Sequence, residues 1–382
     1  MMNKRIVNLF LVAKVLEQAA SAWFFGTYVL FLTATGLTLL QVNILNVIFM
    51  TTSTIFDPFT GNLADRIGQK RVYLSGLFFW GVGMTIYGLN RTIWMFALAE
   101  GIGAIGHALQ SEALESWLRN HTDEEVTKRT QAKAQLWAKL ATIPAAILGG
   151  LIGAKYGLQW PWLLAGISSF LALGLIWFLG RNVPEKPDNY PSEPVPSVWS
   201  MAKVIAKDKK LRQVVVLYAL VSACVMPFNM FWQIVFSDAG GKTEWMGSVW
   251  IGVAVFSALG AKLSTKIRDG LRTLAIPIIL IGVPMVGTGF LVNLWVIMTL
   301  FFLHELGRGM WPLAVFNYSN RYIAPHVRST VNSLRSASGT IGAASGLIIS
   351  GLLTKIFPPQ EVWTISAVIL LLVAIWTLKQ KD

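Results

Sequence analysis

The sequence predicts an all-α membrane protein with twelve transmembrane helices in two six-helix, pseudo-symmetric bundles. Of its 382 residues, 54% are hydrophobic and only 13% are charged, whereas soluble domains carry roughly 25% charged residues. Apolar runs of about 20 residues, each long enough to cross a bilayer, recur along the whole chain. Lys and Arg concentrate in alternate loops between these runs, which is typical of multi-pass proteins.

The twelve apolar runs divide into two equal sets. We expect the first set to form an N-terminal bundle over residues 1–180 and the second a C-terminal bundle over 213–382. Residues 181–212 are rich in Pro, Lys and Glu, which predicts a cytoplasmic surface linker. The predicted spans are 9–32, 39–60, 72–90, 92–117, 134–155 and 160–180, followed by 213–236, 244–263, 273–292, 294–317, 332–355 and 360–378.

Orientation follows from the basic loops. The positive-inside rule places both termini in the cytoplasm of a cell (inner or plasma) membrane. The net charge of +13 is then a result of topology, so no nucleic-acid partner is expected. The chain begins with a basic segment and enters an apolar run without a small-residue cleavage site, which favours a retained first helix over a signal peptide. The single cysteine, Cys224, excludes a disulfide within the chain.

The strongest motif lies where the second span meets the predicted cytoplasmic side, in the sequence GNLADRIGQKR. Within it, Gly61, Asp65, Arg66, Gly68 and Arg71 have the spacing of a known pattern, and the stretch resembles the signature loop between helices two and three of the major facilitator superfamily. The resemblance implies that the first Gly permits close helix approach and that the Asp meets the positive N-terminal end of a facing helix. These five residues are therefore expected to form a gate.

The resemblance extends over the full chain, because the halves repeat each other weakly. Glu100 lies on the fourth span and Glu305 on its counterpart, the tenth. The fifth and eleventh spans both carry small residues at spacings suited to close helix contact, namely Gly149 with Gly153 and Gly342 with Gly346. Membership would imply a secondary active transporter that works by alternating access, with its substrate path between the halves. The driver would be an ion gradient, expected to be protons, with no cofactor.

Three departures argue against assigning proton antiport from the resemblance alone. Ser264 stands in the second half where Asp65 stands in the first. Ala97 occupies the place of a basic residue that many proton-coupled members carry in the fourth span. Pro144 and the glycines after it match the pattern of antiporters only loosely.

The tenth span carries two ionisable residues near its middle. Glu305 and Arg308 are one helical turn apart, and charged groups at membrane depth usually face a cavity or a partner. One interpretation is a structural ion pair. The other is functional, with Arg308 holding an anionic group of the substrate while Glu305 takes up a proton.

The first half offers three further ionisable candidates. Glu100 and His107 are seven residues apart on the fourth span, so they lie on one helix face. Glu17 on the first span follows Lys14 by one turn, and it is too short to reach the membrane surface as a lysine can. We expect Glu17, Glu100 and His107 to contribute to substrate binding or proton coupling.

Glu112 and Glu115 lie at the predicted cytoplasmic end of the fourth span. They could meet Arg66, Lys70 or Arg71 of the signature stretch, so we assign them to the gate rather than to the substrate.

The seventh span adds uncharged polar groups beside an aromatic ring. Asn229, Trp232 and Gln233 are candidates for substrate binding, and hydrogen bonding between helices is the alternative. Other tryptophans are expected at the membrane interfaces, among them Trp94, Trp160, Trp162 and Trp363.

No enzymatic motif is present. The chain has neither a phosphate-binding Gly-x-x-x-x-Gly-Lys-Ser/Thr sequence nor a His-Glu-x-x-His metal motif. Our interpretation is a monomeric transporter for a small-molecule substrate, embedded in the lipid bilayer, which performs proton-coupled efflux of an amphipathic compound. The alternatives are uptake or exchange of a small anionic metabolite and, as a minor one, a transporter-like membrane receptor.

Overall fold

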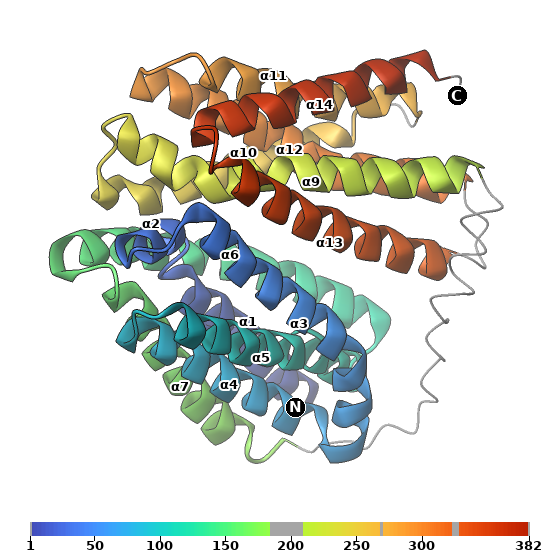
Figure 1. Cartoon of the computed structure of the whole chain (residues 1–382). Helices are drawn as coiled ribbons and strands as arrows, with labels where there is room; N and C mark the ends of the chain where they lie inside the picture. The colour runs from blue at the N-terminus through green and yellow to red at the C-terminus, as the bar shows by residue number, and fades with distance from the viewer. Residues whose placement is uncertain (1, 184–208, 268–269, 323–327, 381–382) are drawn as a thin grey trace. The chain divides into compact units, whose positions relative to one another are not determined.

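The computed structural model describes residues 2–183, 209–267, 270–322 and 328–380, and every regular element in these ranges is a helix. The chain forms two compact units, each a bundle of long helices (Figure 1). The predicted all-α fold is therefore confirmed. Most of the predicted linker, residues 184–208, lies outside the described residues. The units comprise Met1–Glu193 with Lys242–Trp250, and Pro194–Gly241 with Ile251–Asp382.

The first unit contains the helices of the N-terminal half, and each predicted span coincides with a helix or a pair of helices. Several helices extend beyond the predicted apolar run, because a helix continues into water after its hydrophobic part ends. They are α1 (Met2–Ala22), α2 (Tyr28–Ala34), α3 (Leu39–Ile67), α4 (Gln69–Leu89), α5 (Ile93–Arg119), α6 (Glu124–Tyr156) and α7 (Trp160–Gly180).

The second unit repeats this order. A 3-10 turn, η1 (Thr243–Trp245), precedes α10 (Met246–Ser264), and the start of α10 belongs to the first unit. A second turn, η2 (Arg272–Leu274), precedes the short α11 (Ala275–Thr288). The remaining helices are α9 (Lys209–Asp238), α12 (Leu294–Tyr322), α13 (Arg328–Leu353) and α14 (Pro359–Lys379).

Eight of the described helices are long and apolar enough to cross a membrane by length and composition alone. The longest helices that fall short of this measure are α1, α5 and α12. These three carry the ionisable residues predicted to be functional. Their charged and polar side chains make them less apolar than the other long helices.

The first predicted span is not continuous, and the prediction of a single helix there is wrong. The chain leaves helical geometry between Ala22 and Tyr28, where Thr27 N–H donates to the Phe24 carbonyl in a tight turn. A Cβ added to Gly26 would lie 2.8 Å from the backbone of Met246, in the same unit. The residues of the turn are mostly apolar, so hydropathy does not register the break.

The signature stretch is also not a loop. Helix α3 continues to Ile67 and α4 begins at Gln69, so that Gly68 alone joins them. Gly68 has φ +96°, a conformation that residues with a Cβ rarely adopt. Its N–H donates to the Ala64 carbonyl, and its own carbonyl accepts from Val72 N–H.

The predicted small-residue contacts are confirmed for Gly149, Gly342 and Gly346, whereas a Cβ on Gly153 would meet only side chains, at 3.3 Å or more. A Cβ added to Gly342 or Gly346 of α13 would clash with the backbone of Ala219 or Ala223 in α9. The same holds for Gly149 of α6 against Trp23. Backbones approach this closely only where side chains are absent.

Candidate functional site

Glu100 of α5 is buried in the first unit, with 4% of its surface exposed. The hydroxyl of Tyr28, at the start of α2, donates to Glu100 Oε1 over 2.9 Å. The hydroxyl of Tyr87, in the last turn of α4, donates to the same oxygen over 2.5 Å. No basic side chain among the described residues pairs with Glu100, so its only polar partners there are two phenols.

Close packing of α4 on α5 places Tyr87 beside Glu100. A Cβ added to Gly83 would lie 2.9 Å from the Ala99 carbonyl, and one added to Gly106 would lie 2.5 Å from Trp80 N. The helices can therefore approach without side chains between them, and a phenol at the end of α4 reaches a carboxylate on α5.

Aromatic rings pack around the ring of Tyr87, whose hydroxyl donates to this carboxylate. Trp162 stacks on Tyr87 and on Phe24, each with 4.1 Å between ring centroids, and Phe96 stacks on Tyr87 at 5.0 Å. Trp162 is 1% exposed, so its side chain packs inside the bundle rather than facing lipid. Its sequence position near the end of a span does not reveal that it turns inward.

The same inward packing occurs in the second unit. Trp363 is buried, and its Nε1 donates to the Pro227 carbonyl over 3.0 Å. Trp94 and Trp160 are exposed, as expected for residues at an interface.

A second polar group in the first unit lies on α1. Lys14 Nζ is 3.0 Å from Glu17 Oε1, and the Tyr73 hydroxyl lies 3.4 Å from Glu17 Oε2. His107 is within electrostatic range of Glu17, and its Nδ1 lies 3.4 Å from Ser53 Oγ. Lys14, Glu17 and Tyr73 thus form one polar group and Glu100 with its two phenols another, while the side chain of His107 lies beside that of Ser53.

In the second unit, Glu305 and Arg308 form the ion pair that their spacing predicts. Arg308 Nε donates to Glu305 Oε2 over 2.7 Å, and Arg308 Nη2 lies 2.6 Å from the same oxygen. The Glu305 side chain is 1% exposed and that of Arg308 is 30% exposed. The carboxylate is therefore enclosed, while part of the guanidinium remains accessible within this unit.

The candidates of the seventh span divide between packing and polar contact. Trp232 stacks on Phe301, with ring centroids 5.5 Å apart, one helical turn before Glu305 on α12. Asn229 Nδ2 lies 3.9 Å from Met226 Sδ in its own helix. Gln233 is buried. Their roles in substrate binding stay predictions.

The gate residues make contacts that the sequence did not predict. Glu115 accepts a hydrogen bond from Gln131 of α6 over 2.8 Å, and Lys70 donates to the carbonyls of Gly180 and Val183 rather than to Glu115. A Cβ added to Gly61 would meet nothing within 4 Å.

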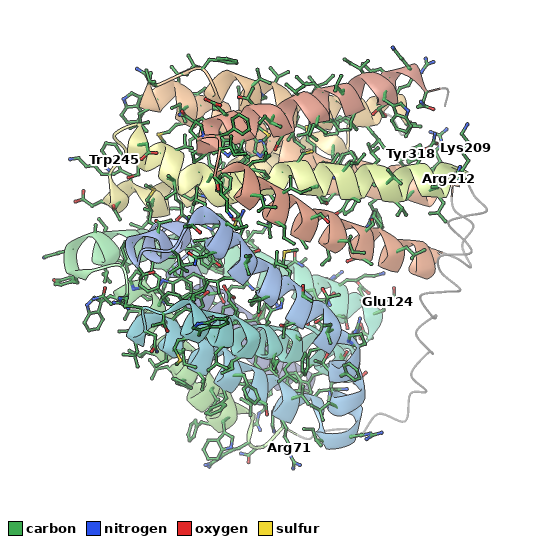
Figure 2. All side chains as sticks on the ribbon, in the orientation of Figure 1. Arg71, Glu124, Lys209, Arg212, Trp245 and Tyr318 are labelled. Atoms are coloured by element: carbon green, nitrogen blue, oxygen red, sulfur yellow. The ribbon has the colours of Figure 1, made fainter. Side chains whose placement is uncertain are left out.

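For the other gate residues, the structure describes exposure at most. Arg66 is exposed, as is Arg71, which lies in the first turn of α4 (Figure 2). The side chains of Asp65 and Glu112 lie outside the described part of the structure. The gating assignment therefore stays a prediction.

Metal chemistry finds no support in the side chains that the structure describes. Among them, no group of three His, Cys, Asp or Glu residues could hold a metal ion.

The arrangement is thus a set of ionisable residues at membrane depth on corresponding helices of two repeated bundles. The family model described as "Major Facilitator Superfamily" matches residues 10–266 and 237–382. The chain belongs to the Major Facilitator Superfamily. Membership identifies it as a transporter fold with several membrane passes, and the predicted family is confirmed.

Curated relatives within the superfamily are distant. Multidrug resistance protein 1 of Bacillus subtilis is 26% identical over 144 residues, which cover 37% of this chain but only 36% of that protein. The uncharacterized MFS-type transporter YxaM of Bacillus subtilis is 22% identical over 394 residues, covering 96% of this chain and 94% of that protein.

Solved transporters of this fold superpose over nearly the whole chain. The nucleoside transporter NupG matches with a TM-score of 0.82 at 14% identity, covering 98% of this chain and 100% of that chain. An auto-inhibited POT family peptide transporter matches with a TM-score of 0.77 at 12% identity, covering 99% and 98%. At such low identity these likenesses show the fold alone.

Sequence reasoning missed Tyr87 and Trp162 as neighbours of Glu100. Tyr87 lies thirteen residues before Glu100 in the sequence, on another helix, so no helical periodicity connects the two. The available signal was indirect, since a buried carboxylate needs hydrogen-bond donors and the chain has only eight tyrosines.

Proposed function

We propose that this superfamily member is a proton-coupled exporter of small amphipathic compounds. It works by alternating access in a cell membrane, with both termini in the cytoplasm. The positive-inside rule supports this orientation. The gradient of protons supplies the driving force, and no cofactor takes part.

The observation that carries the proposal is the environment of Glu100. A carboxylate at membrane depth costs several kcal/mol unless it is neutralised, and no basic side chain in the described structure pairs with it. Both phenols donate to Oε1, which leaves Oε2 for a proton. A carboxyl group that is neutralised by a proton, rather than by a lysine or arginine, can carry that proton across in each transport cycle.

The direction and the substrate class are supported by similarity. Relatives that match about a third of the chain are named multidrug resistance proteins in Bacillus subtilis and Yersinia enterocolitica.

The test uses everted membrane vesicles and an amphipathic cationic dye. We expect a pH gradient to drive dye accumulation in vesicles that contain the wild-type protein. Glu100→Gln should abolish accumulation but preserve equilibrium exchange of preloaded dye, and Glu17→Gln serves as the comparison in the other polar group. If both variants retain gradient-driven accumulation, proton coupling through Glu100 and Glu17 is excluded.

A second function, uptake or exchange of a small anionic metabolite, is favoured by one observation. Arg308 uses Nε and Nη2 for Glu305, and the side chain remains 30% exposed. A partly accessible guanidinium can still bind a carboxylate or phosphate group. Transport of an anionic substrate that is lost in Arg308→Lys would support this function over export.

A further inference from the structure

Helices α9 and α14 of the second unit enclose an apolar groove at one end. The groove has a volume of about 500 Å³. Its wall on α9 consists of Val216, Leu217 and Leu220, and its wall on α14 includes Leu372 and Trp376. Val216 is 50% exposed and Leu372 is 60% exposed, so the groove opens on the surface of apolar membrane helices.

The first unit has a matching groove between α1 and α7, with a volume of about 430 Å³. Leu9 and Val12 line it from α1, and Phe178 and Leu179 line it from α7. Helices α1 and α7 are the first and last of their half, as α9 and α14 are of theirs. The two grooves therefore occupy equivalent places in the repeat.

The lining residues repeat as well. Arg5, Asn8, Leu9 and Val12 of α1 have the same spacing as Gln213, Val216, Leu217 and Leu220 of α9. Arg212, immediately before Gln213, also lines its groove. In both units, polar residues at the start of the helix are thus followed by apolar residues that line the groove.

Basic residues from both helices frame the same end of each groove. In the first unit they are Lys4, Arg5 and Arg181, and in the second Lys209, Arg212 and Lys379. Figure 2 shows Lys209 and Arg212 together at the end of α9. The sequence of α1 has no acidic residue before Glu17, and that of α9 has none before its last residue. Among the described residues of these helix ends, the charged side chains at each groove mouth are therefore all basic.

We propose that each groove binds one anionic phospholipid, with an acyl chain along the apolar wall and the phosphate group at the basic mouth. From Arg212 to Leu220 an α-helix rises about 12 Å, close to the half-thickness of the hydrocarbon core, about 15 Å. The groove is thus long enough for the upper part of one chain. Arginine suits the head group because its planar donors match phosphate oxygens.

Charge complementarity selects an anionic lipid over a zwitterionic one. Basic residues at the membrane surface attract anionic lipids individually, and their contributions add. This inference is independent of the transported substrate and of the direction of transport.

The test counts lipids that remain bound to the full-length protein. Protein purified in mild detergent is titrated with phosphatidylglycerol or phosphatidylcholine and analysed by native mass spectrometry. We expect two phosphatidylglycerol molecules on the wild type. Arg212→Gln with Lys379→Gln should leave one, Arg5→Gln with Arg181→Gln should leave one, and each removed charge should weaken binding roughly five-fold.

Two further sets of variants distinguish binding in the grooves from general attraction of lipid to basic residues. Val216→Phe and Val12→Phe fill the grooves without changing charge, and each should also remove one lipid. The control is Lys128→Gln with Arg129→Gln, which removes two exposed charges already paired with Glu124 and Glu125, and it should retain both lipids.

Three results would overturn the proposal. They are equal retention of phosphatidylcholine, unchanged binding in a variant that combines the four charge substitutions above, and displacement of the lipids by free glycerol phosphate at similar concentration.

Discussion

Glu100 and Glu305 occupy corresponding helices, yet their side-chain partners differ in charge. Two phenols donate to Glu100, whereas Arg308 pairs with Glu305. Phenols stabilise the charged carboxylate by hydrogen bonds but supply no opposite charge. The two halves therefore carry the same residue type with different chemistry, and only the Glu100 group lacks a basic partner.

Replacing Tyr87 by Phe tests the hydrogen bond to Glu100 without removing the ring that stacks on Trp162. A hydrogen bond to a charged group contributes about 1.5–3 kcal/mol and one between neutral groups about 0.5–1.5 kcal/mol. We expect Tyr87→Phe to lower the thermal unfolding temperature in detergent, more strongly at alkaline pH, where Glu100 is charged, than at acidic pH. Tyr156→Phe is the control, because Tyr156 is exposed and should be neutral. Equal losses at both pH values would contradict proton exchange at Glu100.

The Glu305 and Arg308 pair is tested by a double variant. Arg308→Gln alone leaves an uncompensated buried carboxylate and should cost about 3–5 kcal/mol of stability. Glu305→Gln with Arg308→Gln should restore stability, because no unpaired charge remains, but should stay inactive in gradient-driven transport if the pair is functional. Full activity of the double variant, measured in proteoliposomes, would assign the pair to structure alone.

Single-residue predictions succeeded where partners share a helix. The Lys14 and Glu17 pair, like that of Glu305 and Arg308, follows from i to i+3 spacing. The contact of Glu100 with Tyr28 does not, because it joins residues 72 positions apart and depends on how three helices pack. Periodicity describes the faces of one helix and contains no information about which faces meet.

At the scale of elements, hydropathy located the long helices but neither their ends nor the break between α1 and α2. The apolar run predicted over 134–155 belongs to a helix that begins at Glu124, where Asp123 accepts a hydrogen bond from Val126 N–H as an N-cap. A capping residue and a polar first turn mark this start. A run of apolar residues marks only the part of a helix that is expected to lie in lipid.

Gly68 and Gly61 offer a matched test of the joint between α3 and α4. Gly68→Ala forces a Cβ into a positive φ, which costs about 1–2 kcal/mol, so the variant should unfold at lower temperature. Gly61 is helical with open space around it, and Ala is a better helix former there, so Gly61→Ala should be as stable as the wild type or more stable. Equal stability of the two variants would show that Gly68 does not require its positive φ.

At the scale of the whole molecule, topology can be tested along one helix. Helix α6 has an exposed lysine near each end, Lys128 and Lys155, and the one native cysteine, Cys224, is buried. In intact cells, a membrane-impermeant maleimide should label Lys155→Cys but not Lys128→Cys, and everted vesicles should give the opposite result. Labelling of both positions in sealed vesicles of one orientation would refute the proposed orientation.

Helix α11 has a consequence for the lipid around the protein. It continues directly from the 3-10 turn η2, and the helical stretch Arg272–Thr288 spans roughly 27 Å, slightly less than the roughly 30 Å of an average hydrocarbon core. Ile276 and Val283 are exposed on it, so lipid chains contact a helix that is slightly short for them. A bilayer responds to such hydrophobic mismatch by thinning beside the helix. The bilayer should therefore be thinnest next to α11.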